Sequence, residues 1–565
     1  MKTIKNILTL VLLLTATFSL SQGEWVIHSE AERPVSPAYR ITEQPKVIDT
    51  VIPTPTTEYP LLVKSKETVI RLNDIDPARI RIKDKLDKLY PGYVKLGLGN
   101  YTSPLGEFYF NSTRNRRMNY GAHIKHFSSW GDLEGLSPAA FDQTSGKLFG
   151  EFFTSNFRIE TELDYMNNGY HFYGIEDTTD FFDKDTLRNR VQRIGGMFRL
   201  SNYERKDSAK LLWTAKIGNY YFHEFQKEWD YWGDKHARNN NFILGANFKY
   251  KMGKNLYNLD FDWIYNRYLF AENDATLPFT ERFDDRNANI SLRPTISTYG
   301  KKWKVVYGVD VTFDFPKKDK IFKVVPVIEG KYSLFNDMFI PYVGIDGGVT
   351  QTTFYTLNRL NPYIYSGQEL LNETLYNFYG GIKGTLSKTI SFNVAVHYRD
   401  YTNKALFVNE ETYSDLNRFE VVYDNMSAFG ATGSVSYQKD EKLKIDLIGE
   451  YNKYTTENQL FAWYLPELQI TARGSYNLYD KLYAKADFTL ETGRKSPVYL
   501  YNQAPDDIPV DLGVIADGNL EFEYRYNARI SAFLQFNNIA AQKYDRWYKY
   551  RVQGFQVLGG VTFGF

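Results

Sequence analysis

The final stretch of the chain, Gln553–Phe565, alternates between two kinds of side chain over its whole length. One side carries Phe555, Val557, Gly559, Val561, Phe563 and Phe565, and the other carries Gly554, Gln556, Leu558, Gly560, Thr562 and Gly564. Because successive side chains of a strand point to opposite faces, this pattern predicts a strand with an apolar face and a small or polar face. The edge strand of a soluble sandwich is the alternative, but a flat apolar edge in water favours aggregation.

The same alternation recurs through most of the chain. Clear examples are Phe157–Tyr165, Tyr257–Tyr265, Trp303–Phe313, Ile390–Arg399, Leu443–Tyr451 and Leu482–Leu490. Aromatic residues make up 17% of the sequence, with 45 Tyr and 40 Phe, yet the mean hydropathy of −0.45 is hydrophilic. Both facts follow if apolar side chains occupy every second position and aromatic side chains form girdles at two membrane interfaces.

The connections between these segments alternate in length. Short turns are expected near 154–156, 251–254, 334–337, 387–389, 438–441, 478–481 and 526–529. Long polar loops are expected near 129–145, 171–190, 223–239, 351–373, 402–425, 455–466 and 491–516. Short turns on one side and long loops on the other are typical of an up-and-down antiparallel transmembrane β-barrel, with periplasmic turns and extracellular loops. Counting hairpins predicts about 22 strands, an even number if both ends of the barrel domain are periplasmic.

The amino-terminal region has a different composition. Lys2 and Lys5 precede an apolar run, Ile7–Phe18, that is too short to span a bilayer, and Ser19 and Ser21 suit a cleavage site. We therefore expect a signal peptide at 1–21, a Pro-rich periplasmic segment and tether at 22–92, and an outer-membrane β-barrel at 93–565. The prolines of the middle region indicate an extended segment that builds little core.

The end of the chain also resembles a known family. The segment Arg529–Ile539, which contains Asn537-Asn538, leads to Lys543-Tyr544 and then to the terminal aromatic strand. This arrangement is similar to the carboxyl end of TonB-dependent receptor barrels. The resemblance implies an outer-membrane barrel of about 22 strands, whose last strand, ending at Phe565, is read by the barrel-assembly machinery and closes against the first.

The amino-terminal side departs from that family. TonB-dependent receptors carry a plug domain of well over a hundred residues, whereas here the Pro-rich segment 22–92 stands in its place. The segments Asp49–Ile52 and Glu67–Ile70 look like the short extended TonB box of the family. We expect a barrel without a recognisable plug domain, for which coupling to TonB is an open question.

The sequence singles out no catalytic, cofactor-binding or metal-binding residue, and we expect neither an enzyme nor a cofactor. The chain has no cysteine, and His123 and His126 fall on opposite faces of a strand. An acidic loop could bind Ca²⁺ or be a solvated surface, and an aromatic cluster could bind sugars or a partner, or pack onto neighbouring loops. The acidic loop comprises Glu176, Asp177, Asp180, Asp183 and Asp185, and the cluster comprises Tyr220, Tyr221, Phe222, Phe225, Trp229, Tyr231 and Trp232.

Two functions remain open. A barrel of about 22 strands encloses a space that must be filled, by residues 22–92, by infolded loops or by another protein. The first function is transport of an unidentified solute, and the second is a non-transporting scaffold within a larger outer-membrane complex. We expect inward charges such as Arg158, Glu160, Asp260 and Lys444 to pair across the lumen or bind its filler. The expected partners are outer-membrane lipid and a protein held through 22–92 or the long loops; a net charge of +1 argues against nucleic acid.

Overall fold

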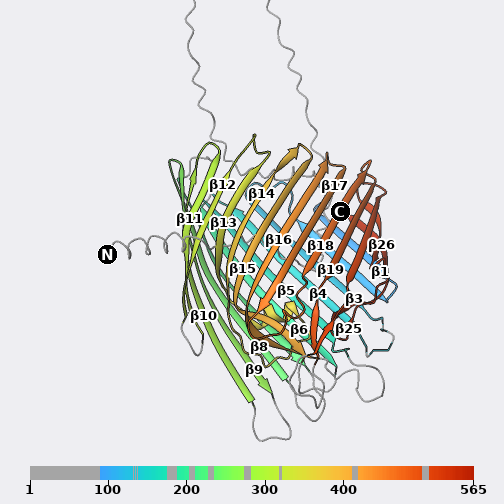
Figure 1. The fold of residues 1–565 in the computed structure, drawn as a ribbon. Coiled ribbons are helices and arrows are strands. Elements are labelled where there is room, and N and C mark those ends of the chain that lie inside the picture. The colour runs from blue at the N-terminus through green and yellow to red at the C-terminus, as the bar shows by residue number, and fades with distance from the viewer. Residues whose placement is uncertain are drawn as a thin grey trace, which may run out of the picture.

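A computed structural model describes residues 89–565, apart from residues 132, 134 and 137 and the segments 175–186, 203–209, 227–234, 273–280, 317–320, 410–417 and 499–507. The predicted signal peptide, nearly all of the predicted Pro-rich segment and the acidic loop therefore lie outside the described residues. The described chain forms a tall cylinder of tilted antiparallel strands (Figure 1). No helix among these residues is long and apolar enough to cross a membrane.

The cylinder is a single closed sheet of 22 strands, as the hairpin count predicts. The first strand, β1 (Gly92–Gly99), pairs with β2 on one edge and with the last strand, β26 (Gln556–Gly564), on the other. Gly92 and Phe565 exchange backbone hydrogen bonds of 3.1 and 2.9 Å at the periplasmic end of this seam. Closure leaves no unpaired sheet edge at the seam. A β-sheet in lipid must be closed in this way, because lipid offers no hydrogen-bond partners to an open edge.

Between these two strands the chain runs up and down the wall in sequence order. The other strands of the closed sheet are β2 (Ser103–Asn111), β3 (Met118–Ser129), β4 (Phe141–Phe153), β5 (Phe157–His171), β6 (Arg188–Asn202), β7 (Leu211–Gln226), β8 (Lys235–Met252), β9 (Asn255–Glu272), β10 (Glu281–Tyr299), β11 (Trp303–Phe315), β12 (Ile321–Tyr332), β13 (Ile340–Thr350), β14 (Glu373–Ser387), β15 (Ile390–Asn409), β16 (Phe419–Lys439), β17 (Leu443–Thr456), β18 (Leu468–Leu478), β19 (Leu482–Thr492), β22 (Ile515–Arg525) and β23 (Ile530–Asn537). Two small hairpins stand apart from it, β20 (Lys495–Val498) with β21 (Ile508–Asp511) and β24 (Asp545–Trp547) with β25 (Tyr550–Arg551). The helix α2 (Phe354–Leu360) lies between β13 and β14.

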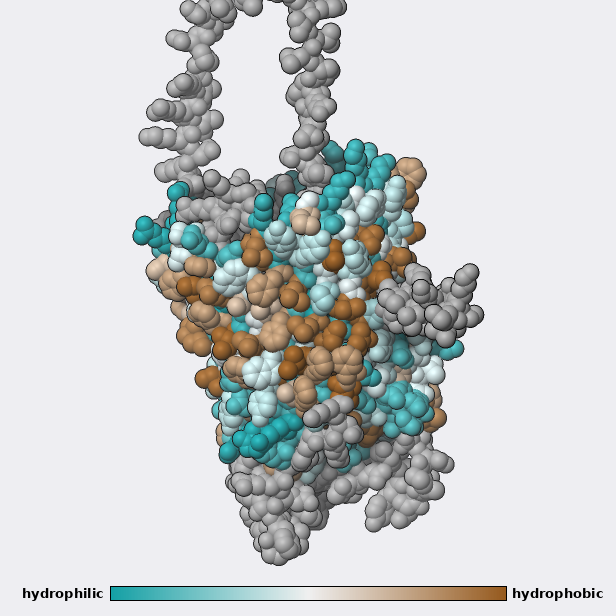
Figure 2. Space-filling view, turned by 90° about the vertical axis from the view of Figure 1, so that its left-hand side faces the viewer, coloured by the Kyte–Doolittle hydropathy of each residue, from teal (hydrophilic) through white to brown (hydrophobic). Residues whose placement is uncertain are grey.

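The wall has an apolar outer face and a polar inner face. Outward side chains such as Leu163, Ile194 and Val343 are about 60% exposed, whereas the positions between them carry charged and amide groups. Figure 2 shows the result on one side of the cylinder, an apolar band bordered by hydrophilic residues towards both ends. Lipid is the solvent that such a band requires, so the barrel spans the outer membrane.

The short turns lie together at one end, and each of the seven predicted ones separates two paired strands. The long connections lie at the opposite, extracellular end. Two predicted loops are shorter than expected: 223–239 and 402–425 continue as strand at both ends, to Gln226 and from Lys235 in the first and to Asn409 and from Phe419 in the second. Those strand extensions rise above the apolar band.

The pairing between β12 and β13 is short and directs the chain into the lumen. Only Ile328–Lys331 of β12 pairs with β13, over four residue pairs. Beyond them, a Cβ on Gly347 would lie 2.9 Å from Cγ1 of Val325, a buried side chain on the inner face of β12. Glycine at Gly347 permits this close approach. The outer half of β13 therefore separates from β12 while it stays paired with β14, and residues 351–372 follow it into the bore.

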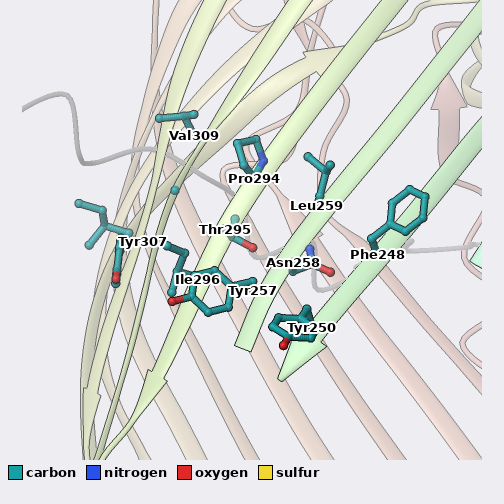
Figure 3. A pocket seen from close by; sticks show the side chains of 12 residues that line it. Phe248, Tyr250, Tyr257, Asn258, Leu259, Pro294, Thr295, Ile296, Tyr307 and Val309 are labelled. Atoms are coloured by element: carbon teal, nitrogen blue, oxygen red, sulfur yellow. The ribbon is translucent and has the colours of Figure 1, made fainter. Parts of the chain in front are cut away.

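The outer wall also bears a shallow dent beside Pro294 of β10 (Figure 3). The ladder between β10 and β11 skips Arg293 and Pro294, consistent with the missing amide hydrogen of proline. The dent has a volume of about 640 Å³, and outward side chains such as Phe248, Tyr250 and Leu259 line it. The dent belongs to the lipid-facing surface.

The orientation can be tested by cysteine labelling, because the natural chain contains no cysteine. Tyr479 lies 83% exposed in the turn between β18 and β19, and Val514 lies exposed in the long connection before β22. We expect a membrane-impermeant maleimide to label Val514→Cys in intact cells and Tyr479→Cys only after lysis. The reverse pattern would mean that the barrel is inserted the other way round.

Candidate functional site: the capped outer mouth

The inner wall of the barrel is lined with ion pairs between neighbouring side chains. Arg158, Glu160, Asp260 and Lys444 all contact neighbours on the wall, so the contacts that the structure gives do not cross the lumen, and binding of a filler stays a prediction. The pairs are Arg158 with Glu160 (2.8 Å), Lys444 with Asp446 (3.0 Å) and Asp260 with the donating amide of Asn258 (2.6 Å). Pairing of adjacent charges gives the bore a polar surface on which positive and negative groups alternate.

Near the start of residues 351–372 is the helix α2, whose first turn is stabilised by side chains of the helix itself. Thr353 caps α2: its hydroxyl accepts the amide hydrogen of Thr356 at 3.1 Å, and the Thr356 hydroxyl accepts that of Thr353 at 2.9 Å. This reciprocal arrangement is a capping box, which satisfies backbone donors at the start of a helix. Phe354 and Leu357 are the buried apolar residues of α2, and their spacing of three places them on one face.

That face of α2 packs against the inner wall above the apolar band. The ring of Phe354 lies 5.8 Å from that of Phe222 on β7 and 5.1 Å from that of Tyr268 on β9. All three side chains have no measurable exposure. Aromatic rings at these separations pack favourably beyond the area that they bury. The helix is therefore fixed to the inner wall at β7 and β9.

Polar contacts tie the same segment to β5, β6 and β7. The Tyr170 hydroxyl donates to the carbonyl oxygen of Pro362 at 2.7 Å. Glu224, which is almost fully buried, accepts hydrogen bonds from the amide of Asn189 (2.7 Å) and from the hydroxyl of Ser366. A buried carboxylate is stable only when it is hydrogen-bonded in this way, so these partners also hold the segment in place.

The chain after α2 then reaches β16, on another part of the wall. Ile364 forms a parallel bridge with Phe419, in which the Tyr365 amide donates to the Phe419 carbonyl (2.8 Å) and the Phe419 amide to the Tyr363 carbonyl (3.1 Å). The Gln368 side chain accepts the amide hydrogen of Val421 at 2.8 Å. The segment thus spans from β7–β9 to β16.

The hairpin of β24 and β25 enters the mouth from the carboxyl-terminal side. The ring of Trp547 lies 5.2 Å from Phe407 of β15 and 4.7 Å from Tyr464. Arg494 donates to the carbonyl oxygens of Arg546 (2.9 Å) and Asp545 (3.0 Å). Burial, followed by the neighbouring Arg546 guanidinium, lowers the pKa of Arg494, and these carbonyls compensate for its lost hydration.

The two sets of segments meet at Tyr550 in the middle of the mouth. Its ring stacks on that of Tyr363, with centroids 3.6 Å apart and planes at 19°, and lies 4.9 Å from the ring of Tyr173. Burial raises the pKa of Tyr173 to about 12, and the Tyr173 hydroxyl donates to the carbonyl oxygen of Arg551 at 3.0 Å. We call residues 351–372, 457–467 and 493–498 together with 544–551 the cap. The cap crosses the bore and shares one buried aromatic core.

Beneath the cap, the inner faces of β8, β9 and β10 carry buried asparagines. Asn241 donates to the side chain of Gln351 (3.2 Å), and Asn239 accepts the amide hydrogen of Tyr355 (3.4 Å). The set consists of Asn239, Asn241, Asn266, Asn287 and Asn289, each at most 4% exposed. Amide side chains can both donate and accept, so they suit a surface that receives irregular backbone.

The structure divides the predicted aromatic cluster. Phe222 and Tyr220 point inward and pack on the cap, with Tyr220 5.3 Å from the ring of Tyr355, whereas Tyr221 and Phe225 are exposed on the outer face. Trp229, Tyr231 and Trp232 lie outside the described residues, as do Glu176, Asp177, Asp180, Asp183 and Asp185. Tyr220 and Phe222 therefore pack onto a neighbouring loop, which was one of the predicted roles of the cluster.

The histidines do not form a metal pair. His123 contacts Glu107 at 2.7 Å on the inner face, and His126 contacts Thr144 at 2.8 Å on the outer face, as the strand period predicts. Within the described ranges, no group of three or more His, Cys, Asp or Glu side chains could hold a metal ion.

Comparison with known proteins places the fold. No family model and no curated protein matches the sequence. Among solved structures, the pyoverdine receptor FpvA of Pseudomonas aeruginosa matches with a TM-score of 0.64 at 12% identity, over 85% of this chain and 79% of that one. The FrpB iron transporter of Neisseria meningitidis (TM-score 0.64, 11% identity, 85% and 82% covered) and the siderophore receptor PirA of Acinetobacter baumannii (0.64, 12%, 85% and 81%) match equally well. The chain therefore has the fold of the TonB-dependent outer-membrane receptors.

Proposed function

We propose that this protein moves a hydrophilic solute across the outer membrane and that the cap is its extracellular gate. The observation that carries this proposal is the cap itself, which crosses the bore where a solute from outside would enter. The ion-paired inner wall suits a hydrated solute better than an apolar one. Neighbours in fold include a siderophore receptor, an iron transporter and a copper transporter, which support transport as the class of function.

The second candidate is a non-transporting scaffold. The observation that favours it is the completeness of the cap core, because Phe354, Phe419 and Tyr550 have no measurable exposure. An element that opens is usually drawn from the less stable part of a fold. A permanently closed barrel would instead offer its outer surface, its loops and residues 22–92 to other proteins. Neither a plug nor a TonB box forms part of either proposal.

Conductance in planar bilayers separates the two candidates. We expect the full chain and a variant lacking residues 23–75 to be silent, because the cap remains in place in both. Combining that deletion with Tyr550→Ala should give large stable steps, because a bore of this strand number is wide once unfilled. Tyr479→Ala in the same deletion background is the control and should stay silent. If the combined variant shows no conductance and a partner protein stays bound in mild detergent, the transport proposal is rejected in favour of the scaffold.

A further inference from the structure

A group of arginines lies on the lipid-facing side of the wall, outside the capped mouth. Phe222, Ala237, Asn239 and Tyr268 point inward and are fully buried, so their neighbours along the strands point outward. The outward neighbours are Tyr221 on β7, Arg238 and Asn240 on β8, Arg267 and Leu269 on β9, and Asp284 and Arg286 on β10. These residues share one sector of the barrel.

Their height on the wall is set by the apolar band. Moving towards the periplasm along the outward face, Arg267 is followed by Tyr265, Trp263, Phe261 and Leu259, and Arg286 by Ala288, Ile290 and Leu292. The arginines thus stand immediately beyond the extracellular edge of the band. In the outer membrane this is the level of the lipid headgroups of the outer leaflet.

The cluster carries more positive than negative charge. Arg267 and Arg286 lie directly opposite each other on adjacent strands, and both contact Asp284, at 3.1 and 2.9 Å. Like charges in directly opposed positions of a sheet repel each other, and one carboxylate compensates for only one of them. Within the described part of the chain, no carboxylate lies within ion-pair distance of the exposed Arg238. Among the described side chains of this sector, Arg267 and Arg286 therefore share one carboxylate, and Arg238 has none.

A concavity of about 220 Å³ lies among these side chains. It is lined by Tyr221, Arg238, Asn240, Arg267 and Leu269. The lining offers two guanidinium groups, an amide and a phenol around an opening to the outside, with Leu269 as an apolar contact. Guanidinium groups bind phosphate through paired charge-assisted hydrogen bonds, and asparagine and tyrosine donors complete such a site.

We propose that this concavity binds a phosphate group of a glycolipid in the outer leaflet, with the acyl chains of that lipid lying against the apolar band below. The site would fix one lipid to the β7–β10 sector, whether the barrel transports a solute or serves as a scaffold. The lipid phosphate also supplies the negative charge that the opposed Arg267 and Arg286 lack.

Native mass spectrometry of the delipidated full chain in detergent tests the site, with lipid A and dephosphorylated lipid A as probes. We expect Arg238→Gln/Arg267→Gln to weaken lipid A retention by roughly tenfold or more, since each lost charge-assisted hydrogen bond weakens binding about that much. Lys453→Gln is the control, because Lys453 also follows the apolar face at the outer end of a strand, β17, in another sector. Heat-modifiable migration on gels verifies that each variant is folded.

The outcomes separate the sources of phosphate. Loss of lipid A binding in the arginine variant, unchanged binding in Lys453→Gln and weak binding of dephosphorylated lipid A to all three proteins would support the proposal. Equal retention of lipid A by the arginine variant, or equal retention of the dephosphorylated lipid, would overturn it. Displacement of lipid A by millimolar inorganic phosphate would reassign the concavity to a free anion and would equally overturn a lipid site.

Discussion

Replacing Tyr550 with alanine should open the outer mouth of the barrel. The Tyr550 ring is fully buried between Tyr173 and Tyr363, which come from two separate connections, and Phe419, the first residue of β16. Truncating a large buried aromatic side chain costs about 3–5 kcal/mol. That loss acts on the cap alone, because Tyr550 belongs to none of the 22 strands of the wall. The population of open mouths should rise by at least about tenfold.

A reporter inside the bore measures this opening directly. Arg473 lies half-exposed on the inner face of β18, opposite Asp487 of β19. In an Arg473→Cys background, a bulky membrane-impermeant maleimide should label intact cells slowly, and adding Tyr550→Ala should accelerate labelling by the same factor. Tyr479→Ala, in an exposed periplasmic turn, should leave the rate unchanged. Unchanged labelling in a correctly folded Tyr550→Ala barrel would mean that the cap does not close the mouth.

Gly560→Val should prevent the barrel from closing. A Cβ at Gly560 of β26 would overlap the backbone oxygen of Leu96 on β1 and lie 2.6 Å from the ring of Phe533 on β23. The Phe533 ring also covers Gly97, where a Cβ would come 2.8 Å from it, so one buried aromatic side chain lies across the seam. Backbone cannot move aside as a flexible side chain can, and overpacking of this kind costs several kcal/mol. We expect heat-modifiable migration to be lost and the chain to be degraded.

The neighbouring glycine provides a matched control. At Gly559 a Cβ would meet Leu534 at 3.5 Å and the carbonyl oxygen of Phe533 at 3.8 Å, which are ordinary contacts. Gly559→Ala should therefore fold with near-normal yield. Combining Gly560→Val with Phe533→Ala should restore little, since the Leu96 backbone remains in the way. Normal assembly of Gly560→Val would show that β1 and β26 do not pair as the structure has them.

The wall of this protein could be predicted from the sequence because lipid imposes a simple rule on it. Outward positions within the band are predominantly apolar, so residues such as Leu259, Phe261 and Trp263 indicate a strand. The same rule gives the turns and the strand number. The pairing of β1 with the terminal strand was instead implied by the resemblance in the last residues, and the structure confirms it.

The rule fails where the strands leave the membrane. The start of β8 reads Lys-His-Ala-Arg-Asn-Asn-Asn, a polar run whose first five residues lie in the predicted loop 223–239. It is strand because Ala237, Asn239 and Asn241 face the cap, and amide side chains are as suitable there as apolar ones. The outer parts of β15 and β16 lie in the predicted loop 402–425 for a related reason. Their inward residues pack on the cap, so the apolar face of the strand there points inward and not towards lipid.

The cap could not be derived from local pattern. The connection 351–373 was expected to be a polar loop, yet it holds the fully buried Phe354, Leu357 and Ile364. Their partners lie far away in sequence, on β7, β9 and β16, and spacing alone does not identify them. A usable signal was the aromatic content of a supposed loop, because Phe354, Tyr355, Tyr363 and Tyr365 would be unusual in water.

The position of Tyr550 in the chain sets an order of events during biogenesis. The ring that joins the two halves of the cap stands just before β26, the strand that completes the cylinder. A nascent barrel lacking its final hairpin would hold α2 against β7 but have nothing to stack on Tyr363. Closure of the outer mouth and pairing of β1 with β26 should therefore occur together. The outer membrane would then never contain a completed barrel with an open pore.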